Sequence, residues 1–166
     1  MKVFVTGATG FIGRALSERL IDEGHAVKAL ARESASISSL EHLDLEIVPG
    51  DIRDADVVEK AMDGCEHVYH LAAATSWSRT RPEYAAVNVE GTRNVARAAW
   101  KAGVRRLVYA STVGVYGSLT SPPIDESTPP RPDSRYRETK LAGEEVVLSW
   151  QRKERLPVVI ARLATT

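Results

Sequence analysis

Short apolar runs alternate along this chain with longer segments in which apolar residues recur every three or four positions. The short runs predict strands and the longer segments predict helices, an alternation typical of βαβ units and a parallel sheet. We expect six strands, over residues 2–6, 25–30, 45–48, 66–71, 106–111 and 158–163. We expect helices from residue 11 to a C-cap at Gly24, from an N-cap at Asp54 through residue 62, over 82–103, and over 134–155.

Six strands joined by helical crossovers predict an α/β fold, a doubly wound parallel sheet of the Rossmann type. Such a fold has three layers, α/β/α, and the strand order 3-2-1-4-5-6. Ligands bind these sheets at the carboxyl ends of the strands, close to the point where the strand order reverses. The segments expected there are Gly7–Gly13, Ala31–Arg32, Asp51–Ile52, Leu71–Ala74 and Ser111–Thr112.

Length and charge narrow the class of protein. The 166 residues fit one domain, 1–166, and the 22 Lys and Arg residues balance the 22 Asp and Glu residues. A net charge of zero gives no broad attraction to nucleic acid or to an anionic membrane. The apolar runs are too short for a membrane helix, and the amino terminus does not resemble a signal peptide. We therefore expect a cytoplasmic chain with a small-molecule ligand.

Glycines dominate the turn after the first strand, where Gly7, Thr9, Gly10, Phe11, Ile12 and Gly13 lead into a helix. Glycines allow the backbone to approach a pyrophosphate, and the helix amino terminus offers free N–H groups to the anion. A tight turn without a ligand is the alternative. The position of this turn, at the start of a βαβ unit, favours a dinucleotide site.

The second strand ends in Arg32, where NAD sites usually carry a carboxylate for the ribose 2′-hydroxyl. An arginine at this place can bind a 2′-phosphate, so we expect NADP, with NAD as the alternative if Glu33 serves the ribose. Asp51, with Ile52 after it, is placed to accept a hydrogen bond from an adenine amino group. Capping of the next helix is the other role open to Asp51.

Tyr136 and Lys140 lie four residues apart at the start of the last helix and therefore share one of its faces. An ammonium and an oxidised nicotinamide would lower the pKa of the phenol, so that Tyr136 could exchange a proton with a substrate. Ser111 or Thr112, at the end of the fifth strand, could bind the substrate oxygen. A chance tyrosine–lysine pair and an ordinary strand-end turn are the alternatives.

Several motifs together resemble the extended short-chain dehydrogenase/reductase family, the NAD(P)-dependent sugar epimerases, dehydratases and reductases. They are TGATGFIG (6–13), GDIRD (50–54), HLAA (70–73), NVEGT (88–92), STVGVYG (111–117) and YRETK (136–140). The resemblance implies a Rossmann cofactor domain, with Thr112, Tyr136 and Lys140 as the catalytic hydroxyl, acid/base and supporting lysine. It also implies that Gly7, Gly10 and Gly13 line the pyrophosphate, Asp51 and Ile52 the adenine, and Leu71, Ala72 and Ala73 the middle of the cofactor. Asn88 would support the site from its helix.

Some positions depart from the family pattern. Arg32 resembles the NADP-using branch around the dihydroflavonol reductases, and Ser111-Thr112-Val113 lacks the Thr-Asp-Glu triplet of sugar 4,6-dehydratases. Family members continue into a carboxyl-terminal substrate domain that we expect to be absent here, so little turnover is expected from this chain alone. A cofactor-binding sensor and an inactive fragment are the alternatives to an oxidoreductase or epimerase.

The sequence gives weaker evidence for a functional role of other residues. Cys65 and His67 would share a strand face but supply only two ligands, so no metal site is expected, and Cys65 is interpreted as a small buried residue. Trp77, Arg79 and Arg81 could contact a substrate or be incidental loop residues. Val146, Val147 and Trp150 could join the helix pair through which many family members form homodimers.

Overall fold

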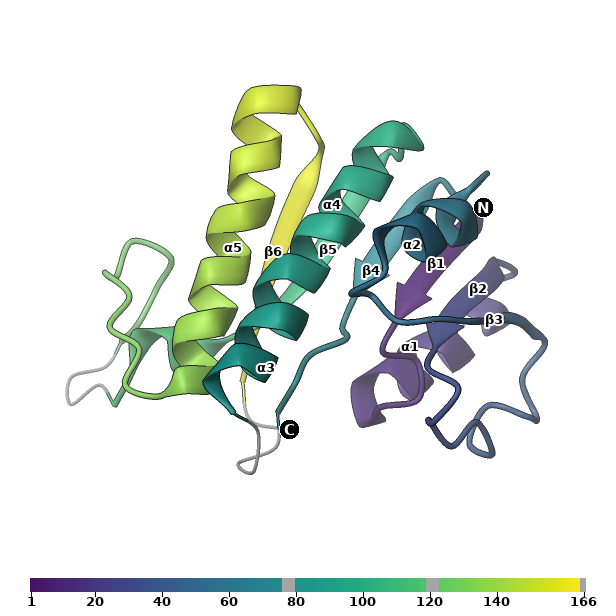
Figure 1. The fold of residues 1–166 in the computed structure, drawn as a ribbon, viewed down its shortest axis with the longest axis horizontal. Helices are drawn as coiled ribbons and strands as arrows, with labels where there is room; N and C mark the ends of the chain where they lie inside the picture. The colour runs from purple at the N-terminus through teal and green to yellow at the C-terminus, as the bar shows by residue number, and fades with distance from the viewer. Residues whose placement is uncertain (76–79, 119–122, 165–166) are drawn as a thin grey trace.

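The computed structural model describes residues 1–75, 80–118 and 123–164, and within them the strands form one six-stranded parallel sheet (Figure 1). The strand order is β3-β2-β1-β4-β5-β6, which confirms the predicted doubly wound Rossmann topology. The strands are β1 (Lys2–Thr6), β2 (Ala26–Ala31), β3 (Leu45–Pro49), β4 (His67–His70), β5 (Arg106–Thr112) and β6 (Val158–Leu163).

Helices lie on both faces of this sheet, and α1, α2 and α5 among them follow predicted segments. Helix α1 (Phe11–Asp22) packs on β1 and β2, whereas α2 (Ala55–Met62), α4 (Thr92–Lys101) and α5 (Arg135–Glu154) pack side by side on the opposite face (Figure 1). The Asp54 carboxylate accepts hydrogen bonds from the backbone N–H groups of Asp56 and Val57, so the predicted N-cap of α2 is confirmed. The helix α5 is capped by the Ser134 hydroxyl.

The predicted helix 82–103 is not one regular helix. It begins as α3 (Arg81–Ala85), passes through a π-helical turn η1 (Ala86–Gly91) and continues as α4. A π turn inserts one extra residue into the helical ladder and often lies at a functional site. A 3₁₀ helix η2 (Val113–Tyr116), also absent from the sequence prediction, follows β5.

Two apolar clusters hold the layers together because side chains of a strand alternate between faces. Phe4 of β1 packs under α2 and α4, while its neighbours Val3 and Val5 pack under α1. All three side chains are completely buried. Among the described residues, no helix combines the length and apolarity needed to cross a membrane.

Candidate active site

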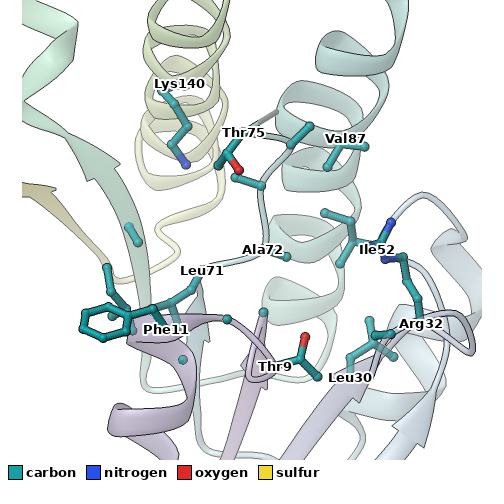
Figure 2. Close-up of a pocket in the computed structure, with 18 of the residues that line it drawn as sticks. Thr9, Phe11, Leu30, Arg32, Ile52, Leu71, Ala72, Thr75, Val87 and Lys140 are labelled. Atoms are coloured by element: carbon teal, nitrogen blue, oxygen red, sulfur yellow. The ribbon is translucent and has the colours of Figure 1, made fainter. Parts of the chain in front are cut away.

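A pocket of about 720 Å³ opens at the carboxyl ends of the strands (Figure 2). Lys140 enters it from α5 at one end, and Arg32 lies at the other end. All the residues predicted for cofactor binding or catalysis line it: Gly7, Thr9, Gly10, Phe11, Ile12, Gly13, Arg32, Asp51, Ile52, Leu71, Ala72, Ala73, Thr112, Tyr136 and Lys140. The fold therefore brings the predicted glycine loop, the arginine and the tyrosine–lysine pair into one cavity.

The glycine loop fits a bound pyrophosphate. A Cβ at Gly13 would lie 2.1 Å from the Gly7 carbonyl oxygen, and Gly7 itself has a φ of +77°. In the described part of the chain no side chain caps the amino terminus of α1, where Gly10 is the N-cap. The first-turn N–H groups and the positive end of the helix dipole thus face the pocket, as an anion site requires.

Arg32 and Asp51 mark the far end of the pocket. Glu33, the alternative ribose ligand, is not among the described residues that line it, whereas Arg32 is. The Asp51 carboxylate accepts hydrogen bonds from the Arg53 backbone N–H, Nε and Nη2, at 2.9, 3.0 and 2.7 Å. These contacts with Arg53 hold the pKa of Asp51 below its usual value. Because Asp54 caps α2, the alternative capping role of Asp51 is wrong.

At the other end of the pocket Tyr136 is half-buried and Lys140 is buried. Burial raises the pKa of Tyr136, and the neighbouring Tyr84 raises it further. Lys140 is 2% exposed, and burial lowers the pKa of its ammonium to about 7. Burial therefore sets the direction of the Tyr136 pKa shift here, and the lowering expected from the ammonium together with an oxidised nicotinamide stays a prediction.

Thr112 and Ser111 have different partners. The Thr112 hydroxyl accepts a hydrogen bond from the Gly114 backbone N–H at 3.0 Å and remains at the pocket wall. The Ser111 hydroxyl donates to Glu144 Oε1 at 2.5 Å, a buried contact with α5. Both residues line the pocket, but the Ser111 hydroxyl donates its proton to Glu144, whereas Thr112 acts as an acceptor in its contact with Gly114.

Asn88 joins the π turn to both sides of the site. Its Oδ1 accepts from the Ala74 N–H at 2.7 Å, and its Nδ2 donates to the Ala74 carbonyl and to the Thr139 hydroxyl. Asn88 is 1% exposed, so these bonds are shielded from water. The extra residue of η1 places this amide between the loop after β4 and the first turns of α5, in agreement with its predicted supporting role.

Some pocket residues were not predicted from the sequence. Leu163 ends β6, so the strand-end rule that found Thr112 would also have found it. Arg53 follows Asp51 by two residues, but nothing in the sequence indicates that it binds this carboxylate. Glu83 and Val87 reach the pocket from α3 and η1, which no motif signalled.

The loop, cysteine and dimer-helix candidates from the sequence have different outcomes in the structure. Trp77 and Arg79 lie outside the described residues. Cys65 is 4% exposed, as predicted for a small buried residue, and among the described residues no three His, Cys, Asp or Glu side chains gather as for a metal ion. Val146 and Val147 are buried within the chain, whereas Trp150 is half-buried, and dimer formation itself stays a prediction.

This chain is similar in sequence to proteins of one known family. Residues 3–166 match the family described as "NAD dependent epimerase/dehydratase family". A Synechocystis sp. protein provisionally named as a dihydroflavonol 4-reductase is 42% identical over 115 residues, which are 69% of this chain and 33% of that protein. UDP-glucose 4-epimerase of Mycolicibacterium smegmatis is 41% identical over 154 residues, which are 87% of this chain and 49% of that protein.

A solved structure agrees with this match. DesIV, a dTDP-glucose 4,6-dehydratase of Streptomyces venezuelae determined with NAD bound, superposes with a TM-score of 0.91 at 32% identity. The superposition covers 98% of this chain and 55% of DesIV. The chain thus spans between a third and just over half of the length of these relatives.

Proposed function

The chain belongs to the NAD dependent epimerase/dehydratase family, and we propose that it is the dinucleotide-binding domain of an NADP(H)-dependent oxidoreductase or epimerase. One observation carries this proposal: a single pocket is lined both by the glycine loop with Arg32 and by Thr112, Tyr136 and Lys140. The substrate we propose is a small molecule with a hydroxyl or carbonyl carbon, either a nucleotide sugar or a small carbonyl compound. The names of the related epimerase, dehydratase and reductase support that class.

The glycine loop and Arg32 would hold the dinucleotide. Backbone N–H groups at the start of α1 bind the pyrophosphate, and Arg32 binds the 2′-phosphate that distinguishes NADP from NAD. When bound, the nicotinamide supplies the hydride acceptor or donor. Leu71, Ala72 and Ala73 line the stretch of the pocket between these two ends, and the small side chains of the two alanines leave room for the middle of the cofactor.

Proton chemistry falls to Tyr136. Its deprotonated phenolate oxygen takes a proton from the substrate hydroxyl during oxidation, and its protonated hydroxyl returns one to a carbonyl oxygen during reduction. Lys140 favours the deprotonated phenol when its ammonium is charged, and Thr112 donates a hydrogen bond to the substrate oxygen. Because burial alone moves both pKa values toward the neutral forms, the charged pair depends on the electrostatic setting of the loaded pocket.

Thermal melts with NADPH and NADH test the cofactor assignment. At a hundred times its dissociation constant, NADPH adds about 2.7 kcal/mol and raises the midpoint by roughly 5–11 °C. We expect Arg32→Ala to abolish most of the NADPH shift, whereas Arg152→Ala, at the exposed end of α5, leaves it unchanged. An equal shift with NADH that Arg32→Ala does not alter would overturn the NADP assignment.

A second experiment tests catalysis by Tyr136. NADPH oxidation is followed with a panel of aldehydes, ketones and 4-keto sugar nucleotides, in wild type and in Tyr136→Phe. Loss of a general acid/base lowers the rate by about a hundredfold or more, while NADPH stabilisation of Tyr136→Phe stays at the wild-type level. NADPH binding without turnover on any member of the panel would favour the sensor or the inactive fragment instead.

A further inference from the structure

The ammonium of Lys140 is enclosed by the fold. Among the described residues, no carboxylate lies within ion-pair distance of Nζ, although the residue is 2% exposed. The acid nearest in sequence on the same helix face, Glu144, accepts hydrogen bonds from Arg162 Nε at 3.0 Å and from Arg162 Nη2 at 2.7 Å. Glu144 also accepts from Ser111, so its oxygens are directed to β5 and β6.

An aromatic ring takes the place that a carboxylate would fill. The Lys140 Nζ lies 4.2 Å from the centroid of the Tyr109 ring, a cation–π geometry. Tyr109, on β5, is completely buried, and its hydroxyl donates to the Lys140 backbone carbonyl at 3.3 Å. One side chain thus contacts both the ammonium and the backbone of the same lysine.

The packing around Tyr109 fixes this arrangement. A Cβ at Gly143 would lie 2.1 Å from the Tyr109 hydroxyl oxygen, so only glycine at this position lets α5 come so close to the ring. On the β4 side, the His70 ring lies 5.6 Å from the Tyr109 ring, centroid to centroid. The titratable groups around the ammonium are therefore His70 of β4, Tyr109 of β5, and Tyr136 and Glu144 of α5, with Arg162 of β6 behind Glu144.

We propose that Tyr109 is a positioning residue that holds the Lys140 ammonium in the pocket through its ring. This inference rests on the proposed function, in which that ammonium supports Tyr136 and the dinucleotide. A carboxylate at the same place would cancel most of the positive charge, whereas a neutral ring attracts the cation and leaves its charge available to the ligand. Tyr109 therefore acts through Lys140 and does not itself touch the substrate.

Nuclear magnetic resonance of protein labelled with ¹³C at the lysine ε-carbon reads this contact directly, without cofactor. Lys140→Arg assigns the Lys140 resonance. We expect its ε-methylene protons to lie upfield of those of exposed lysines through the ring current, in wild type and in Tyr109→Phe. The upfield shift disappears in Tyr109→Leu and persists in Tyr69→Leu, because Tyr69 packs on the α1 side of the sheet.

Two further readouts separate positioning from general stability. In Tyr109→Leu we expect the Lys140 titration midpoint to fall by about one pH unit and the NADPH dissociation constant to rise about tenfold, the same 1.4 kcal/mol on either scale. In Tyr109→Phe we expect both to remain at the wild-type values. A wild-type Lys140 resonance without a ring-current shift overturns the proposal, even if Tyr109→Leu does not fold. If wild type fails to bind NADPH while the ring-current shift is present, the proposed function fails and the contact stands.

Discussion

His70 is a base that the fold keeps neutral at the centre of the sheet. Its Nδ1 lies 2.7 Å from the Thr6 hydroxyl and its Nε2 lies 3.0 Å from the Thr92 hydroxyl. The Thr6 hydroxyl in turn accepts from the Ala72 N–H at 3.2 Å. This chain of contacts joins the end of β1, where the glycine loop begins, to the segment that lines the middle of the pocket.

Burial of His70 gives the stability of the chain a defined pH dependence. Complete burial lowers its pKa from 6.5 to about 3, so between these values the unfolded chain binds a proton that the folded chain does not. The stability that neutral His70 contributes is full above pH 6.5 and is lost as the pH falls toward 3. From pH 7.5 to 4.5 this amounts to about 3 kcal/mol.

Urea unfolding at both pH values tests this dependence. We expect His70→Gln to be less stable than wild type at pH 7.5 but to lose less stability on acidification. His67→Gln, a partly exposed position on the same strand, should keep the wild-type slope. If His70→Gln and wild type lose the same stability between the two pH values, the assignment of this acid sensitivity to His70 is wrong.

At the scale of elements, the start of α1 depends on close backbone approach. In Gly13→Ala the new Cβ would meet the Gly7 carbonyl oxygen at 2.1 Å, and backbone atoms cannot yield as a flexible side chain can. The matched control, Gly24→Ala just beyond α1, meets nothing within 4 Å and is strained only by its φ of +78°. We expect this control to lose about 1 kcal/mol of stability and to keep NADPH binding.

Gly13→Ala should instead lose the NADPH-induced shift of the melting midpoint, because the loop must move away from the helix end to relieve the contact. Circular dichroism before each melt establishes that the variant is folded. A folded Gly13→Ala chain with wild-type NADPH stabilisation would show that the close approach of Gly13 to Gly7 is not needed for the anion site.

Most elements could be predicted because their signals are local. Asp54 and Gly64 bracket α2, and the apolar runs of β1 and β6 agree with the observed strands. The π turn η1 left no such signal, because the extra residue is stabilised by bonds of Asn88 to Ala74 and Thr139, residues distant in sequence. Helical periodicity over six residues cannot separate a π turn from an α turn.

Site residues, too, could be predicted where the signal is local and could not where it depends on distant contacts. Positions at strand ends, such as Arg32 and Thr112, could be placed in the pocket from topology alone. The partner of each side chain could not, since it depends on tertiary packing: Asp51 binds Arg53, and Ser111 binds Glu144. The rise of the Tyr136 pKa on burial could not be predicted either, because burial cannot be read from the spacing of Tyr136 and Lys140.

At the scale of the whole molecule, a shared fold does not determine which reaction is catalysed. The superposition on DesIV, a 4,6-dehydratase, extends over nearly the whole chain, yet the triplet at 111–113 here is Ser-Thr-Val. The Val113 side chain has no acidic or basic group that could move a proton. Shared architecture therefore supports the dinucleotide site, whereas the choice of reaction rests on the few side chains around Thr112 and Tyr136.

The pocket joins parts of the chain that are distant in sequence, and this gives a prediction for the molecule as a whole. A dinucleotide bound along the pocket from Arg32 to Lys140 would contact the ends of β1, β2, β4 and β5 and the start of α5 at once. A ligand that binds only the folded state suppresses the local opening of every element it joins.

We expect NADPH to slow amide hydrogen exchange both in residues 7–13 and in residues 136–140, although these segments are separated by more than a hundred positions. Arg32→Ala should weaken both effects together. Protection of the glycine loop alone would mean that the ligand does not reach the tyrosine–lysine end, and the two ends of the pocket would then be separate sites.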